Sequence, residues 1–377
     1  MKTFDDISVQ RPALAQSYLS MLTAQPGRPL ALFAPRRVGK TYFLDNDLAP
    51  NAKKLGLLPV YADLWLYKAA PLEAINHALE EVLDELSVPQ SAVGKVSKTP
   101  VKSVGVLGVN VAFGEEPSQR SLPAEPTLRF DALIVRIAKT FGGKVLLLLD
   151  EVQTLGEVAN GVALIAAIRA VLHKQKNHVY AVFTGSSQEG LSLIMNTAGA
   201  PMYQFAQIID FPFLGDEYLK KLVDHFRKVH LGKTLELDAL RDVFASIGYR
   251  PALMRDIVKA MSAEGIADTA QGLENFMRSD SQVSLWKSLL NSLDAFEVGV
   301  LQVVVQGEAP LGQAARKMLS GIPGANPTIG KVRTTLDKLK RKGILSKTTA
   351  GTLIDDPLFA QFILRQGFGV QRNGKPG

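Results

Sequence analysis

The segment Ala34–Thr41 carries residue types that could bind phosphate. It reads Ala-Pro-Arg-Arg-Val-Gly-Lys-Thr, follows the apolar run Leu30–Phe33 and precedes the apolar-patterned segment Tyr42–Leu48. This order predicts a strand, a tight loop and a helix, which is the context that a phosphate-binding loop (P-loop) requires. The backbone N–H groups of such a loop form an anion site together with the N-terminus of the following helix.

Two side chains of this loop suit a nucleoside triphosphate. Lys40 would reach the terminal phosphates, and the Thr41 hydroxyl would hold Mg²⁺. The candidate nucleotide-binding residues of this segment are Ala34, Pro35, Arg36, Arg37, Val38, Gly39, Lys40, Thr41 and Tyr42. Ala34 stands where a P-loop usually has its first glycine, and alanine tolerates a positive φ poorly. The alternative is a Gly-Lys-Thr turn that arose by chance.

A pair of carboxylates ends a continuous apolar run. Val145–Leu149 is continuously apolar and is followed by Asp150 and Glu151. Such a run is typical of a central parallel strand buried on both faces, and ligands bind at the carboxyl edge of such sheets. We assign Asp150 to Mg²⁺, directly or through water, and Glu151 to the water that attacks the γ-phosphate. The alternative is a strand end with two solvated acids.

A small polar cluster follows a second apolar run. Val179–Phe183 is expected to be a strand, and it ends in Thr184-Gly185-Ser186-Ser187. Thr184 or Ser186 could contact the attacking water or the γ-phosphate if this strand neighbours the acid-bearing one. The alternative is an ordinary turn with a helix-capping serine.

Strand and helix patterns alternate through the first half of the chain. Besides the segments above, strands are expected at 58–63 and 208–213, and helices at 13–23, 71–86, 126–141 and 161–174. This alternation predicts an α/β fold with a parallel sheet. Residues 101–113 partly alternate, which indicates an inserted hairpin or flexible loop. The pattern is helical from 216 to 287.

The C-terminal region is patterned as a winged helix-turn-helix. Helices are expected at 292–305, 309–319 and 328–342, followed by a wing formed by 344–347 and 353–354. Basic residues gather here, which suits an anionic partner such as DNA. Lys331, Arg333, Thr334, Thr335, Lys338 and Arg341 are the residues expected to face DNA phosphates or base edges. The alternatives are a protein-binding winged helix and a solvated basic surface.

Together these patterns give a domain plan. We expect a P-loop core at 1–214 with an insertion at 88–126, a helical lid at 215–288, a winged helix at 289–370 and a disordered tail at 371–377.

Composition limits the classes of protein that the chain can form. Its 377 residues are enough for two or three domains. The absence of cysteine excludes disulfides and thiolate metal sites, and the five histidines show no ligand spacing. No apolar run approaches the roughly 18–20 residues of a transmembrane helix, and the N-terminus is unlike a signal peptide. We expect a cytoplasmic protein with no membrane partner.

The sequence resembles the archaeal-type ATPases of the AAA/STAND branch of P-loop NTPases. The resemblance rests on the P-loop ending Arg-Arg-Val-Gly-Lys-Thr, on Asp150-Glu151-Val152-Gln153, on the strand ending Thr184-Gly185-Ser186-Ser187, and on Ala200–Tyr203 and Gly248–Pro251. A C-terminal winged helix is frequent in this group, and the resemblance covers nearly the whole chain.

The resemblance implies roles for these residues. Lys40 and Thr41 would bind ATP and Mg²⁺, and Thr184 or Ser186 would sense the γ-phosphate. Pro251 would lie near the adenine or sugar, with Tyr249 and Arg250 close by. Arg250 or Arg255 would be a further phosphate contact.

One departure from the family pattern bears on turnover. The family commonly continues Gly-Arg after Ala200–Tyr203, whereas this chain has Gln204-Phe205. Slow hydrolysis is then expected, or an arginine finger supplied by a protein partner or by another copy in a homo-oligomer. Such a finger is worth about 10³–10⁵ in turnover.

Two functions therefore remain open. One is a DNA-associated ATPase whose nucleotide state alters its grip on duplex DNA or a neighbour. The other is a STAND-like signalling switch, in which ATP holds an assembly-competent state and the C-terminal module binds protein. A metabolic kinase is disfavoured because the sequence shows no acceptor site.

Overall fold

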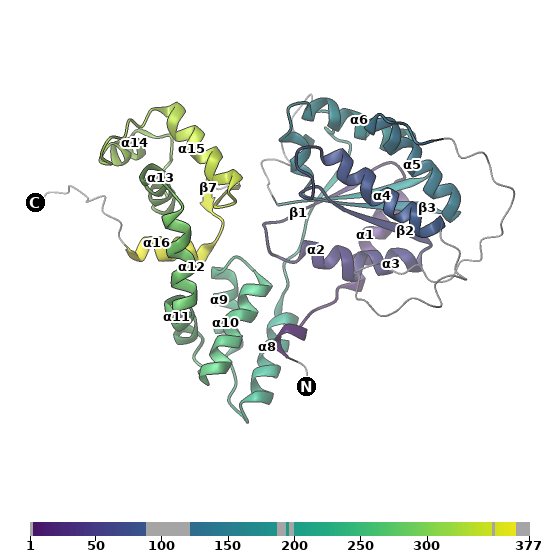
Figure 1. Ribbon diagram of the computed structural model, residues 1–377. Helices are drawn as coiled ribbons and strands as arrows, with labels where there is room; N and C mark the ends of the chain where they lie inside the picture. The colour runs from purple at the N-terminus through teal and green to yellow at the C-terminus, as the bar shows by residue number, and fades with distance from the viewer. Residues whose placement is uncertain (1–2, 88–120, 187–193, 196–199, 349–350, 367–377) are drawn as a thin grey trace, which may run out of the picture.

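The computed structural model describes residues 3–87, 121–186, 194–195, 200–348 and 351–366, and these form two lobes (Figure 1). The first lobe is a sheet with helices on both faces, and the second lobe is mainly helical. Most of the insertion expected at 88–126, and the tail expected at 371–377, lie outside the described residues.

The sheet of the first lobe has five parallel strands in the order β2-β3-β4-β1-β5. The strands are β1 (Leu30–Phe33), β2 (Leu57–Asp63), β3 (Lys144–Asp150), β4 (Val179–Gly185) and β5 (Gln207–Asp210). The prediction of a parallel α/β sheet is confirmed. This order places the end of β4 between the end of β3 and the P-loop that follows β1, so the expected polar clusters meet at one edge.

Helices cover both faces of the sheet (Figure 1). One face carries α1 (Pro12–Ala24), α2 (Lys40–Phe43), η2 (Leu44–Leu48) and α3 (Ala49–Lys54), and the other carries α4 (Pro71–Ser87), α5 (Pro126–Phe141) and α6 (Gly161–Lys174). Leu146 and Leu148 of β3 pack on the first face, while Leu147 and Leu149 pack on the second. Burial on both faces explains the continuous apolar run of β3.

The helix expected at 42–48 differs from the prediction. After α2 the backbone takes one π-helical turn, η2, before α3 begins. The buried Asp47 lies in this turn, and its Oδ1 accepts a hydrogen bond of 2.7 Å from the backbone N–H of Arg11. The wider turn therefore coincides with the point where the N-terminal segment is attached to the sheet lobe.

The second lobe joins the expected lid and the C-terminal region through one hydrophobic core. Its first part contains α8 (Asp216–Val229), α9 (Leu237–Ser246), α10 (Pro251–Glu264), α11 (Thr269–Arg278) and α12 (Asp280–Asn291). The C-terminal module, residues 294–366, contains α13 (Ala295–Val305), α14 (Gln313–Leu319), α15 (Ile329–Arg341), β6 (Leu345–Thr348), β7 (Gly351–Ile354) and α16 (Pro357–Gln366). The boundary expected at 288/289 falls inside α12.

The N-terminal segment bridges the two lobes. In η1 (Phe4–Asp6), the Phe4 ring lies 4.3 Å from the ring of His225 in the second lobe. Arg11 contacts the first lobe, because its guanidinium lies over the rings of Phe43 and Phe211 at 5.0 and 4.3 Å. Residues 7–10 therefore run between the lobes. None of the described helices is long and apolar enough to span a membrane.

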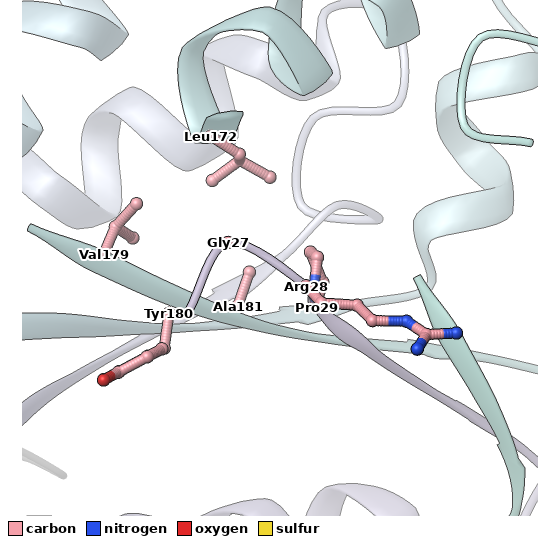
Figure 2. A pocket seen from close by; sticks show the side chains of 7 residues that line it. All are labelled: Gly27, Arg28, Pro29, Leu172, Val179, Tyr180 and Ala181. Atoms are coloured by element: carbon pink, nitrogen blue, oxygen red, sulfur yellow. The ribbon is translucent and has the colours of Figure 1, made fainter. Parts of the chain in front are cut away.

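A small cavity lies at the amino edge of the sheet, away from the P-loop. It has a volume of about 10 Å³ and is lined by Gly27, Arg28, Pro29, Leu172, Val179, Tyr180 and Ala181 (Figure 2). This volume is close to the roughly 10–15 Å³ that a single water needs, so the cavity is too small for an organic ligand.

Candidate functional site

The Asp150 carboxylate is the centre of a network at the carboxyl edge of the sheet. Its Oδ2 accepts hydrogen bonds from Thr41 Oγ1 at 2.8 Å and from the Tyr61 hydroxyl at 3.2 Å. Its Oδ1 accepts from Thr184 Oγ1 and from the backbone N–H of Glu151. Burial and the Asp150 charge raise the pKa of Tyr61, so its hydroxyl remains a donor. Asp150 thus joins the P-loop to β2 and β4.

Lys40 is buried at the start of α2, with 6% of its surface exposed. Its ammonium donates to the carbonyl oxygens of Ala34 and Pro35 at 2.7 and 2.8 Å. Burial lowers its pKa to about 8, although the Glu151 and Asp150 charges oppose this shift. An incoming phosphate would replace carbonyl dipoles with a full negative charge, which favours the protonated lysine.

The backbone of the P-loop accommodates Ala34 without strain. The residues of this loop with a positive φ are Arg37, at 65°, and Gly39, at 96°. Ala34 is not among them and is packed in the hydrophobic core. Alanine therefore fits where a first glycine is usual, because this position does not need the left-handed region.

Glu151 has a strained backbone, with φ 57° and ψ 44°. Such left-handed conformations of non-glycine residues gather at functional sites. Its Oε2 accepts a hydrogen bond of 2.7 Å from Ser186 Oγ and another from Gln153 Nε2. The side chain is therefore fixed at the end of β3, beside Asp150, where a general base would have to lie.

A cavity of about 870 Å³ opens from this edge and extends between the two lobes. Its walls include the P-loop, Glu151, the N-terminal segment, the start of α10, part of α12 and Asp356. Six cations and four acids line it: Arg11, Arg36, Arg37, Lys40, Arg250 and Arg255 against Asp5, Glu151, Asp256 and Asp356. This excess of cations favours an anionic ligand.

Part of the lining of the cavity is less polar. This part is formed by Ile7, Val9, Leu214, Tyr218, Pro251 and Leu253. Tyr218 is fixed there because its hydroxyl donates to the Pro251 carbonyl at 2.6 Å. The same cavity therefore offers cations, hydroxyls and apolar surface.

Arg250, the N-cap residue of α10, and Arg255 within α10 both line this cavity but have different partners. Arg250, which is 4% exposed, donates through Nη2 to the carbonyl oxygen of Asp355 and to its Oδ2 at 3.3 Å. Its Nη1 is buried and makes no hydrogen bond. Arg255 donates to the Asp5 carbonyl at 3.5 Å and lies 3.6 Å from its carboxylate.

The residues at the edge fit Mg²⁺ held together with phosphate. Thr41 and Asp150 supply the oxygen ligands that Mg²⁺ prefers, and Mg²⁺ typically keeps several waters and binds substrate phosphates as well. Within the described ranges, no group of three or more His, Cys, Asp or Glu side chains could hold a metal on its own. The donor set therefore suits a metal that arrives with a nucleotide.

Several residues of the site were not predicted from the sequence. Tyr61 and Asp63 lie on β2, and Asp63 pairs in register with Asp150. Burial raises the pKa of Asp63. Trp65 follows, with its ring 4.5 Å from the Arg36 guanidinium. The sequence did contain a signal for Asp63, because β2 ends in an acid just as β3 does.

The prediction for Thr335 on α15 is wrong. This residue is 8% exposed, and its hydroxyl donates to the Lys331 carbonyl at 2.9 Å, so it belongs to the core face of the helix. Lys338 is exposed, but its ammonium lies 3.0 Å from the buried Glu297. Lys331, Arg333 and Arg341 are exposed on the helix.

Comparison with solved structures identifies the fold. The structure is similar to the Walker-type ATPase PABY2304 of Pyrococcus abyssi, with a TM-score of 0.58 and 16% identity over 96% of this chain and 100% of that one. It is also similar to the ORC2 protein of Aeropyrum pernix in its ADPNP-ADP complexes, with a TM-score of 0.50 and 15% identity over 94% and 92% of the two chains. No family model matches the sequence, and no curated protein matches it. The chain thus has the fold of a P-loop ATPase of the AAA+ type.

The Asp150 network predicts a loss of stability when one hydroxyl is removed. Thr184→Val keeps the side-chain shape but takes one donor from a buried carboxylate. We expect the free energy of unfolding to fall by about 1.5–3 kcal/mol, the usual worth of a hydrogen bond to a charged group. Urea denaturation of the full chain, followed through the unfolding of the sheet lobe, measures this loss of free energy. Thr23→Val on the exposed side of α1 is the control, and an equal effect of the two variants would contradict the account.

Proposed function

We propose that this protein binds ATP with Mg²⁺ and hydrolyses it to ADP and phosphate. The observation that carries the proposal is the convergence of Lys40, Thr41, Asp150, Glu151 and Thr184 at one edge of the sheet, beside a cavity lined by an excess of cations. The apolar residues of the lining suit a nucleoside base. ORC2 of Aeropyrum pernix, which shares the fold, forms ADPNP-ADP complexes.

In this proposal each residue at the edge has one task. Lys40 leaves the carbonyls of Ala34 and Pro35 to bind the β- and γ-phosphates. Thr41 and Asp150 would hold Mg²⁺, which would neutralise charge that develops on the phosphates. Thr184 binds the γ-phosphate or the water, and Glu151 takes the proton of the attacking water.

The cations at the lobe interface would complete the binding of the nucleotide. Arg250 has an unpaired buried Nη1 and Arg255 is only weakly paired. Either guanidinium can turn to a phosphate oxygen, while Pro251 and Tyr218 flank the base. The region after Ala200–Tyr203 offers no arginine, because Gln204 and the buried Phe205 stand there. We therefore propose slow hydrolysis until another copy or a partner supplies a finger.

Two substitutions separate binding from hydrolysis. Lys40→Ala should weaken ATP binding by at least tenfold, because it removes the buried cation that faces the phosphates. Glu151→Gln should keep the affinity within about twofold yet reduce turnover by 10²–10⁴, the usual worth of a general base. Titration of a fluorescent ATP analogue and steady-state phosphate release measure the two effects.

Lys228→Ala, an exposed lysine of α8, is the matched control for loss of charge. Unchanged affinity of Lys40→Ala would overturn the assignment of the P-loop. A parallel loss of affinity and turnover in Glu151→Gln would make Glu151 a structural residue.

We propose further that the C-terminal module is a winged helix that binds duplex DNA. Three helices and the antiparallel hairpin of β6 and β7 support this arrangement. α15 presents Lys331, Arg333 and Arg341 to solvent, and the Thr328 side chain caps its N-terminus. Lys338 contributes less in this scheme, because Glu297 already binds it.

Removing exposed cations of α15 tests whether the C-terminal module binds duplex DNA. Arg333→Ala with Arg341→Ala should weaken binding to a duplex by about tenfold and lower the slope of log K against log salt by about 2, one per lost phosphate contact. Fluorescence anisotropy across a salt series measures both quantities. Lys220→Ala with Lys228→Ala on α8 is the control, and equal effects of the two pairs would remove α15 from the interface.

One observation favours a nucleotide-controlled switch as a second candidate. The C-terminal module contacts the nucleotide site directly, since Asp355 pairs with Arg250 and Asp356 lines the cavity. A module held in this way could be released by nucleotide and then bind protein rather than DNA. ATP-dependent assembly without affinity for DNA would support this candidate.

A further inference from the structure

The side chain of Arg36 connects four parts of the molecule. It lies in the P-loop, where the family resemblance gives roles to Lys40 and Thr41 but none to the Arg36 side chain. Its Nε donates to Ser186 Oγ at 3.1 Å, and its guanidinium lies over the Trp65 ring at 4.5 Å. It also touches the C-terminal module, because a Cβ on Gly343 would lie 2.8 Å from its Nη1.

The Ser186 hydroxyl accepts a hydrogen bond from Arg36 and donates one to Glu151. A serine hydroxyl has one proton and two acceptor lone pairs. Arg36 Nε–H donates to one lone pair, Gln153 Nε2 lies 3.4 Å from the same oxygen, and the proton goes to Glu151 Oε2, 2.7 Å away. Both bonds that Glu151 accepts, from Ser186 and from Gln153, reach Oε2. The other oxygen, Oε1, can then face a water.

The Arg36 guanidinium is itself held in place. Trp65, on which it stacks, is fixed by its backbone N–H, which donates to Asp63 Oδ1 at 2.8 Å. Gly343 ends α15 with φ 72° and lies directly against Arg36. The backbone there is tied to helix and hairpin, because Ile344 N–H donates to the Leu339 carbonyl and Asp355 N–H to the Ile344 carbonyl.

We propose that Arg36 is a positioning residue that, through Ser186, holds Glu151 ready to activate water, and that the turn at Gly343 sets its position. The inference rests on the proposed ATPase function and adds a route by which the C-terminal module regulates turnover. Movement of the module away from the P-loop changes the surroundings of Arg36, and with them the orientation of Glu151, without altering the phosphate site itself.

The first test separates kcat from KM in the full-length chain. Arg36→Ala and Ser186→Ala should each lower kcat for ATP by roughly tenfold, a fraction of the general-base contribution, with a smaller change in KM. Because Arg36 acts through Ser186, the double variant should be no slower than Ser186→Ala alone. Ser186→Thr keeps the hydroxyl and should restore most of kcat.

The second test perturbs the hydrogen bond between Arg36 and Ser186 by a substitution in the C-terminal module. Gly343→Asn tolerates the positive φ but pushes a side chain against Arg36, and it should lower kcat severalfold. Gly324→Asn is the matched control, since Gly324 has φ 73° in the same module and no atom within 4 Å of the added Cβ. In an Arg36→Ala background, Gly343→Asn should cause no further loss.

The outcomes distinguish the proposed ATPase function from the proposed positioning role of Arg36. If the unmodified chain hydrolyses no ATP, the proposed function fails and this inference fails with it. If it hydrolyses ATP while Arg36→Ala retains full kcat, or the two alanine effects multiply, only the inference fails. Equal kcat values for Gly343→Asn and Gly324→Asn would overturn the link to the C-terminal module.

Discussion

The site depends on one buried carboxylate that must be surrounded by donors. Asp150 is 4% exposed at the end of β3, and burying such a charge is costly unless hydrogen bonds replace its water. Thr41, Tyr61 and Thr184 provide these bonds from three different elements. Their meeting requires the strand order β2-β3-β4-β1, which places these elements side by side. Packing of the sheet therefore brings these groups together at one edge, and their hydrogen bonds constrain the sheet in return.

The second constraint is the contact between the lobes. The cationic cavity is closed by residues from both, and the charge of Asp355 in the C-terminal module raises the pKa of Lys40 in the P-loop against the effect of burial. Arg250, in the same lobe as this aspartate, is buried and pairs with it. A triphosphate would bring several negative charges to the same place. Nucleotide binding and the position of the C-terminal module are therefore expected to influence each other.

The fold and much of the edge could be predicted from the sequence because their signals are local. The run ending in Asp150 marks a strand buried on both faces, and the P-loop pattern marks its own turn. Tyr61 was missed because its role depends on the register of β2 against β3, which no local pattern states. The pair Arg250–Asp355 joins positions far apart in the chain. Thr335 could have been placed correctly, since it lies three residues after Val332 on the apolar stripe of α15.

The most direct test of the central claim is an experimental structure of the full chain with Mg²⁺ and a non-hydrolysable ATP analogue. The account predicts phosphates on Lys40 and the loop amides, Mg²⁺ beside Thr41 and Asp150, and the base beside Pro251 and Tyr218. Density for the analogue elsewhere on the molecule, or a P-loop that keeps Lys40 on the Ala34 carbonyl at saturating analogue, would contradict it.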